Sequence, residues 1–173
     1  MKKYFIVISI LLVIFFSACE SQETVKEDNN LLSYENKDLG ISFKYPSSFT
    51  VGEGIKGAIF ILSDYNNTDN PGVSFGMTII KAQKPSTEEQ IRSLYEGIAK
   101  EASLKLNFKK ESKERYELIE IEFQGFTYYL LSDKGTFIVS DGVDKFKGLL
   151  EQQGLYQKYR KQFDEILKSI KII

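Results

Sequence analysis

Alternation of apolar and polar residues predicts several short β-strands in this chain. Residues 41–45 alternate strictly and end at Pro46, and residues 57–62 form an almost continuous apolar run that is typical of an interior strand. Similar patterns predict strands at 31–34, 73–79, 106–111, 115–123, 126–131 and 136–139, with turns at 36–40 and 132–135. The alternation slips where Leu118 and Ile119 are adjacent, and a β-bulge is one explanation.

The hydrophobic period changes to that of a helix in two regions. After Pro85, apolar residues recur at 91, 94, 95, 98 and 102, and Ser86 with Glu89 matches a capping box. Near the end, a short helical pattern at 146–150 stops at Gly154, and a longer helix follows. Its apolar stripe consists of Tyr159, Phe163, Ile166, Leu167 and Ile170. Hairpin-like strands with one inserted helix and helices at the end predict an α+β fold with a mainly antiparallel sheet, because a parallel sheet needs a helix after nearly every strand.

The first nineteen residues have the layout of a secretory signal peptide. Two lysines precede a 13-residue apolar stretch at 4–16, and the small residues Ser17 and Ala18 follow. A transmembrane helix needs roughly 20 apolar residues, whereas here a polar run begins at residue 20. The sequence therefore predicts export, and an uncleaved short membrane anchor is the alternative.

Composition limits the chemistry that this chain can carry. Its 173 residues include no histidine and one cysteine. Ser-His-Asp and Cys-His nucleophiles and most zinc sites need imidazole, and an internal disulfide needs a second thiol. The formal net charge of −1 disfavours nucleic acid as a partner. We therefore expect a protein that is not an enzyme and has no cofactor, no metal and no nucleic-acid partner.

The single cysteine, Cys19, lies where signal-peptide cleavage is expected. Residues 16–19, Phe-Ser-Ala-Cys, resemble the lipobox of bacterial lipoproteins, although Phe16 replaces the usual leucine. The resemblance implies that residues 1–18 are removed and that Cys19 carries a thioether-linked diacylglyceryl group, usually with a further acyl chain such as palmitate on its amine. Two or more acyl chains anchor a protein stably. The expected location is the extracytoplasmic side of the cell membrane or the outer membrane.

The segment 19–30 is expected to be the lipidated cysteine and a polar tether. Residues 20–30 contain four acidic side chains and one lysine, a net charge of −3, whereas residues 31–173 contain 20 basic and 20 acidic side chains. A flexible coil of this length has an r.m.s. span of about 18 Å. The tether therefore holds the domain 31–173 away from the bilayer.

Two strings near the ends of this domain resemble PsbP-like domains. Residues 40–49, GISFKYPSSF, are similar to their opening strand, and residues 163–171, FDEILKSIK, are similar to their closing helix. The resemblance spans nearly all of 31–173 and implies an α/β/α sandwich around a mainly antiparallel sheet. Photosynthetic members of the family are extrinsic photosystem subunits, and bacterial members include lipoproteins of unknown role. Residues 141–155 depart from the family by adding a short helix, and no catalytic motif carries over.

Oxygen-bearing side chains are concentrated in the loop 64–72. An EF-hand needs glycine and glutamate where this chain has Asp69 and Phe75, so a loop of Asx turns is the plainer interpretation, beside a looser calcium site. Tyrosines suit ligand contacts or the edge of a core. The candidate ligand-binding residues are Asp64, Asn66, Asp69, Tyr128 and Tyr129.

Three patterns raise the question of hydrolase chemistry. Residues 72–76, GVSFG, match a nucleophile elbow, but that motif needs a strand-to-helix turn and a histidine. Asp141 with Asp144 and Glu120 with Glu122 are closely spaced carboxylate pairs, and glycosidases need carboxylates that face each other across a cleft. The glutamates suit the solvated side of a strand, and Asp144 suits a helix N-cap. We expect no catalytic residue.

These observations lead to two hypotheses. The first is a lipid-anchored, non-enzymatic envelope protein whose domain binds another envelope protein. The second is a lipoprotein that binds a small ligand or a metal ion through the loop 64–72. The basic final helix, with five basic and two acidic side chains from residue 155 onward, suits the polar face of an amphipathic helix, or an orientation toward anionic lipid.

Overall fold

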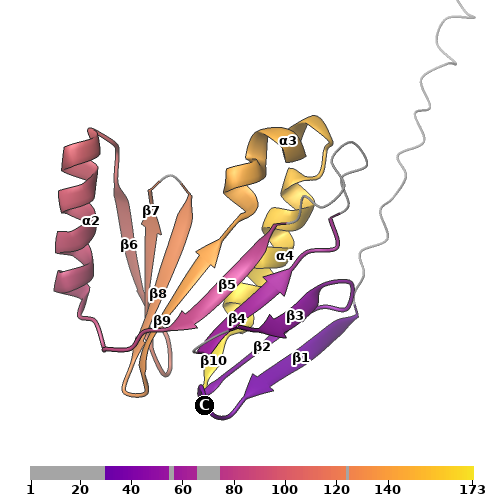
Figure 1. Ribbon diagram of the computed structural model, residues 1–173, viewed down its shortest axis with the longest axis horizontal. Coiled ribbons are helices and arrows are strands. Elements are labelled where there is room, and N and C mark those ends of the chain that lie inside the picture. The colour runs from indigo at the N-terminus through magenta and orange to yellow at the C-terminus, as the bar shows by residue number, and fades with distance from the viewer. Residues whose placement is uncertain (1–29, 55–56, 66–74, 124) are drawn as a thin grey trace, which may run out of the picture.

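A computed structural model describes residues 30–54, 57–65, 75–123 and 125–173. They form two sheets in which all neighbouring strands are antiparallel (Figure 1). The small sheet has the order β1 (Leu31–Asn36), β2 (Ile41–Pro46), β10 (Lys171–Ile172). The large sheet has the order β3 (Thr50–Glu53), β4 (Ala58–Leu62), β5 (Gly76–Lys81), β9 (Gly135–Asp141), β8 (Phe126–Ser132), β7 (Glu117–Glu122), β6 (Asn107–Ser112).

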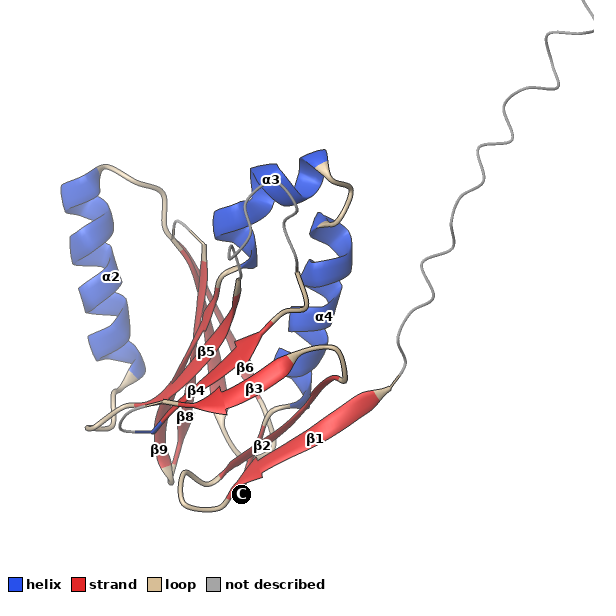
Figure 2. Ribbon diagram, turned by 45° about the vertical axis from the view of Figure 1, so that its right-hand side comes forward, coloured by secondary structure: helices blue, strands red, loops and turns tan. Residues whose placement is uncertain are grey.

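Helices lie on both faces of the large sheet. Helix α2 (Glu88–Ala102) connects β5 to β6, and the chain after β9 forms η3 (Val143–Phe146), α3 (Lys147–Gln152) and α4 (Tyr156–Ser169). Figure 2 shows α2 on one side of the large sheet and α4 on the other. The expected α+β class with an antiparallel sheet is confirmed.

The larger core lies between the large sheet, α4 and the small sheet. Strand alternation places one set of side chains on this face, and α4 contributes the predicted apolar stripe, which is buried throughout. Its fully buried members include Ile41, Ile59, Ile61, Phe137, Val139 and Phe163. Gly154 has φ of +68° and ends the preceding helical segment, as predicted.

A second, smaller core lies on the opposite face, under α2. Its buried members are Ile91 of α2, Ile119 and Ile121 of β7, and Tyr129 of β8. The guanidinium of Arg92 stacks 3.9 Å from the ring centroid of Phe108 on β6. These contacts fix α2 over the β6–β7–β8 half of the sheet.

Several predicted details differ from the structure. The capping box is one residue later than predicted, because the Thr87 and Gln90 side chains bond each other's main-chain N–H groups. No bulge interrupts β7, which pairs continuously with both neighbours over residues 117–122. Strand β5 spans Gly76–Lys81 and so continues two residues beyond the predicted end at 79, whereas residues 73 and 74 of the prediction lie outside the described residues. The last helix ends at Ser169, after which the chain becomes β10, because Ile170 is extended.

Asp144 is not a helix N-cap, which corrects the sequence-based prediction. The N-cap of η3 is Gly142, and no side chain makes the cap hydrogen bond. Asp141 lies at this turn instead, and its Oδ1 accepts a hydrogen bond of 2.8 Å from the main-chain N–H of Val143. Asp144 accepts from the Tyr156 hydroxyl at 2.6 Å, because the return of α4 brings that hydroxyl close.

Candidate functional site: an apolar hollow beside α2

The predicted apolar stripe of α2 is only partly covered. Ile91 and Ala99 are buried against the sheet, but Leu94 and Ile98 are among the most exposed apolar residues that the structure describes. On a helix with 100° per residue, these two lie on the flank opposite Arg92. Because Arg92 faces the edge strand β6, Leu94 and Ile98 face the middle of the sheet.

The sheet beside this flank of α2 is also apolar and uncovered. Phe60 and Leu62 alternate along β4 with the fully buried Ile59 and Ile61, so they lie on the same face as α2. Ile80 on β5 lies on that face as well, because it pairs with Ala58 of β4. The only described helix on this face is α2, and it covers the other half of the sheet.

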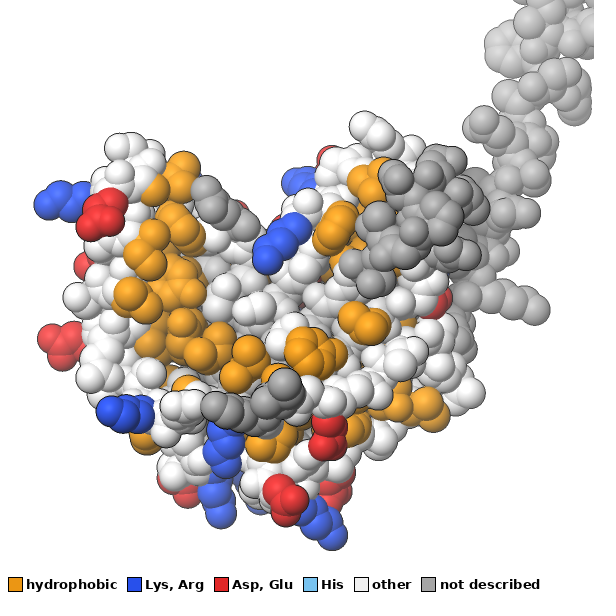
Figure 3. Space-filling view, viewed as in Figure 1, with side chains coloured by type: hydrophobic (Ala, Val, Ile, Leu, Met, Phe, Trp, Pro, Cys, Tyr) orange, Lys and Arg blue, Asp and Glu red, His pale blue; other side chains and the backbone are white. Residues whose placement is uncertain are grey.

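Small side chains separate the exposed residues of β4 from α2. The register aligns Phe60 with Thr78, Thr78 with Ser140, and Ser140 with Thr127 across four strands. Figure 3 shows this face hollowed between α2 and the α3 side, with apolar side chains along the α2 wall and on the floor. We call this surface the apolar hollow and define it by Phe60, Leu62, Ile80, Leu94 and Ile98.

The exposed apolar area of the hollow can be estimated from its five defining side chains. Its five defining side chains are between 41% and 55% exposed. Because a large apolar side chain has roughly 200 Å² of surface, the exposed part amounts to on the order of 400 Å². The largest apolar patch on a typical monomeric protein is about 300–600 Å² and is often functional, so the exposed apolar area of this face, on both sides of the row of small hydroxyl side chains, is of the size of an interaction site.

A buried charge cluster occupies the other face, where β9 meets α4. The guanidinium of Arg160 lies 2.5 Å from Oδ2 of Asp141, 3.3 Å from Oδ2 of Asp144 and 2.7 Å from Oδ1 of Asp164. The Asp141 side chain is fully buried and that of Arg160 nearly so. The cluster therefore joins the end of β9, η3 and α4 through one cation.

Burial and charge act in opposite directions on the pKa values of this cluster. Burial raises the pKa of Asp141 above its ordinary value, although the Arg160 charge and the Val143 N–H lower it. For Arg160, burial alone lowers the pKa, but the charges of Asp141 and Asp164 outweigh it and the net shift is upward. The charge of Asp141 is paired with that of Arg160, which also contacts Asp144. We therefore assign the carboxylates of Asp141 and Asp144 a role in stabilising the fold.

The candidate ligand-binding residues do not form one site in the described part of the chain. Asp64 accepts a hydrogen bond of 3.0 Å from the Tyr159 hydroxyl and lies 4.0 Å from Nζ of Lys158, so it binds α4. Tyr128 and Tyr129 are buried on opposite faces of the sheet, because they are neighbours on one strand. Asn66 and Asp69 lie outside the described residues, as do Cys19 and residues 72–74 of the GVSFG motif.

The described residues contain neither a metal-binding cluster nor a membrane-spanning helix. Glu120 and Glu122 lie on one face of β7, as their spacing predicts. Among the described residues, no three Asp, Glu, His or Cys side chains are grouped to hold a metal ion. Within the same residues, every helix is too short or too polar to cross a bilayer.

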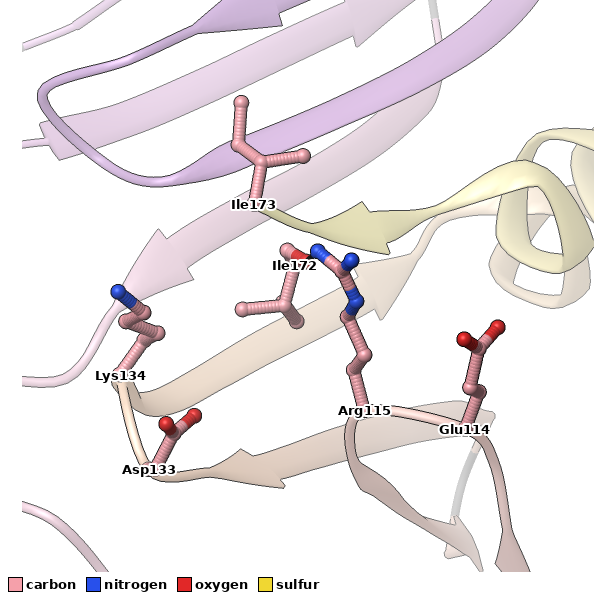
Figure 4. A pocket seen from close by; sticks show the side chains of 6 residues that line it. All are labelled: Glu114, Arg115, Asp133, Lys134, Ile172 and Ile173. Carbon is pink, nitrogen blue, oxygen red and sulfur yellow. Dashed lines mark hydrogen bonds between the residues drawn. The ribbon is translucent and has the colours of Figure 1, made fainter.

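A pocket of about 480 Å³ lies where two hairpin turns meet β10. Figure 4 shows its charged side chains, Glu114 and Arg115 from one turn and Asp133 and Lys134 from the other. Arg115 Nη1 donates to the main-chain oxygen of Ile172 at 3.4 Å. The two positive and two negative side chains are all exposed.

Sequence reasoning missed the apolar hollow, although a clue to it is present in the sequence. A continuous apolar run such as residues 57–62 places apolar side chains on both faces of a strand. Only one helix was predicted between β5 and β6, and a helix about 10 Å wide covers only two or three strands of a seven-stranded sheet. The clue is that the sequence predicts more apolar sheet surface than the predicted helices can cover.

Comparison with known proteins gives a likeness in structure and none in sequence. The chain matches no protein-family model and no curated protein sequence. Its structure is similar to the solution structure of the cyanobacterial PsbP protein (CyanoP) from Synechocystis sp. PCC 6803, with a TM-score of 0.45 and 14% sequence identity. The alignment covers 83% of this chain and 92% of that chain. A likeness of this size transfers no functional residue and no partner to this chain.

Proposed function

We propose that the protein is a lipid-anchored envelope protein whose PsbP-like domain binds another envelope protein through the apolar hollow. The observation that carries this proposal is the exposure of five large apolar side chains, three on one face of the sheet and two on the flank of α2 beside it. Leaving such a surface in water is unfavourable by about 25 cal/mol per Å². A partner that covers it removes this unfavourable term, which offsets part of the entropy that association costs.

The lining of the apolar hollow favours a protein over a small metabolite. Pockets for small molecules place a few polar groups among apolar ones to orient the ligand. The five side chains that define the hollow are all apolar, and its floor includes the small hydroxyl side chains of Thr78, Ser140 and Thr127. The hollow is open to solvent on the side seen in Figure 3 and does not enclose a ligand-sized cavity there. Such a surface suits the apolar centre of a protein interface.

The resemblance to PsbP-like domains gains support from the place of its two strings. Residues 40–49 include β2, and residues 163–171 include the second half of α4. The two are in direct contact, because the main-chain N–H of Lys44 donates to Oγ of Ser169 at 2.8 Å. The strings therefore build one structural unit, as the opening strand and closing helix of one domain require.

Photo-cross-linking from the apolar hollow tests the binding function. A photoreactive phenylalanine analogue at position 94 of the full chain is expected to cross-link to one discrete protein in the producing cells. The matched control carries the same analogue at Leu31, which is also a half-exposed leucine but lies on the small sheet. The function is contradicted when position 94 gives no protein adduct beyond that of the control, as detected by immunoblotting and mass spectrometry.

Substitution of the cysteine tests the lipid anchor. Cys19→Ser removes the thiol that would carry the thioether, so at least tenfold more of the protein is expected in the soluble fraction after cell lysis. Metabolic labelling with an alkyne fatty acid, followed by gel analysis, is expected to lose its band in the same variant. A Ser17→Ala variant keeps the cysteine and controls for general effects on export. An unchanged membrane fraction for Cys19→Ser would assign the anchor to another segment.

A further inference from the structure

The apolar hollow also restricts the kind of element that can fill it. Resting on the binding function proposed above, we propose that the partner inserts an amphipathic α-helix into the apolar hollow, beside α2 and across β9, β5 and β4. The bound helix completes the layer that α2 begins. Three features of the described residues lead to this inference: the pairing of the floor strands, the width of the uncovered sheet, and the size and concave shape of the patch.

The floor strands offer no unpaired main-chain groups to a partner. Strand β4 is paired with β3 and β5, strand β5 with β4 and β9, and β9 with β5 and β8. An extended peptide on this face would leave its own N–H and C=O groups without partners, because strand addition needs a sheet edge. A helix satisfies these groups internally. The hollow therefore selects a helix over a strand.

The uncovered part of the sheet is wide enough for one helix. Neighbouring strands are about 4.8 Å apart, so β9, β5, β4 and β3 together span about 14 Å, and a helix with its side chains is about 10–12 Å wide. On the wall, Leu94 and Ile98 are four residues apart and form the start of an i, i+4 ridge. A second helix packs against such a ridge while its apolar stripe contacts Phe60 and Ile80.

The shape of the patch disfavours the other occupants. A standard interface buries about 800 Å² on each partner, of which roughly 450 Å² is apolar, so the area of the hollow suits one protein interface. A two-fold dimer of this chain would place one hollow against another, and two concave surfaces do not fill each other (Figure 3). A flat bilayer contacts convex surfaces, whereas the floor lies below the wall formed by α2 (Figure 3). A single helix with three or four apolar anchors at i, i+3, i+4 and i+7 matches both the area and the concave shape.

Cross-link mapping from three positions tests the helix directly. The photoreactive analogue is placed in the full chain at position 60, 80 or 94, and the adducts from producing cells are sequenced by mass spectrometry. We expect all three positions to label one segment of one protein, at residues spaced by three, four or seven. A Leu62→Lys change in the chain with the probe at 94 is expected to lower the adduct yield at least tenfold, because it places a charge among apolar contacts.

The matched control for that substitution is Leu32→Lys, which introduces the same charge at a strand leucine that is equally exposed, 42% in both cases, but lies on the small sheet. It is expected to leave the adduct yield within twofold. Labels spaced by two residues, adducts with phospholipid, or adducts with a second copy of this chain would each contradict the proposal of an inserted partner helix. They would still show that the apolar hollow is covered in cells. The absence of any adduct would overturn the binding function itself.

Discussion

Replacing Arg160 by methionine is expected to lower the free energy of unfolding by about 3–5 kcal/mol at neutral pH. Methionine keeps much of the aliphatic volume but removes the cation that contacts Asp141 at 2.5 Å and Asp164 at 2.7 Å. Because the Asp141 side chain is fully buried, its charge is then left without compensation. Urea denaturation followed by circular dichroism measures the loss.

The matched control for this change is Arg92→Met. Arg92 also contacts two carboxylates, those of Glu88 and Glu96, but its side chain is 44% exposed. Solvent screens such pairs, so a much smaller loss is expected. The double variant Arg160→Met with Asp141→Leu is expected to recover part of the stability, because it removes the buried charge together with its partner. An equal loss in Arg92→Met would contradict the special role of the buried cluster.

The pH dependence of the Arg160→Met deficit separates charge from packing. Burial raises the pKa of Asp141 in the folded chain, so the folded state binds more protons than the unfolded state between the ordinary pKa of about 3.9 and the raised value. The contribution of Asp141 to stability therefore falls as the pH rises through this interval. Loss of Arg160 raises the folded pKa further, so the deficit is expected to shrink as the pH is lowered from 7 toward 4. A deficit that is constant with pH would indicate lost packing instead.

Gly76→Ala is expected to cost about 3 kcal/mol of unfolding free energy, at the upper end of the range for overpacking. A Cβ atom at residue 76 would lie 2.2 Å from the main-chain oxygen of Ile61, and main chain cannot move aside as a flexible side chain can. Strands β4 and β5 would have to separate where Gly76 pairs with Leu62. The same urea titration measures the effect.

Gly52→Ala provides the matched control for Gly76→Ala. Gly52 is also in a strand of the large sheet, but no atom lies within 4 Å of the place where its Cβ would be. There the alanine is expected to stabilise the fold by about 0.5 kcal/mol, because glycine loses more backbone entropy on folding. Equal effects at the two positions would show that the close approach of β4 and β5 at Gly76 is unimportant.

The sequence correctly predicts the elements that bury one apolar face against the larger core. The stripe of α4 from Tyr159 to Ile170 is buried throughout, and residues 41–45 form β2, because both face the larger core. The α2 stripe predicts the helix correctly but not its burial. Periodicity identifies apolar side chains, whereas burial also needs a covering layer, and Leu94 and Ile98 have none among the described residues.

Features that depend on distant residues are not predictable from local pattern. Strands β3 and β10 have four and two residues, too few for an alternation to be recognised, and β10 exists because β2 offers it an edge. Asp141 and Arg160 are nineteen positions apart, on a strand and a helix, so their contact depends on how α4 returns across the sheet. The predicted calcium or ligand loop at 64–72 remains a prediction, since most of it lies outside the described residues.

The pairing of the first strands with the last has a consequence for the order of folding. Strand β2 is hydrogen-bonded to β10, the main-chain N–H of Ile173 donates to the Gly40 oxygen at 2.9 Å, and α4 contributes Phe163 to the larger core. During synthesis, which starts at the N-terminus, this core therefore cannot close until residues 163–173 have been added. The β6–β9 meander with α2 contains only local connections, so it is expected to form early. The larger core is therefore expected to close after this meander has formed, once residues 163–173 have reached β2.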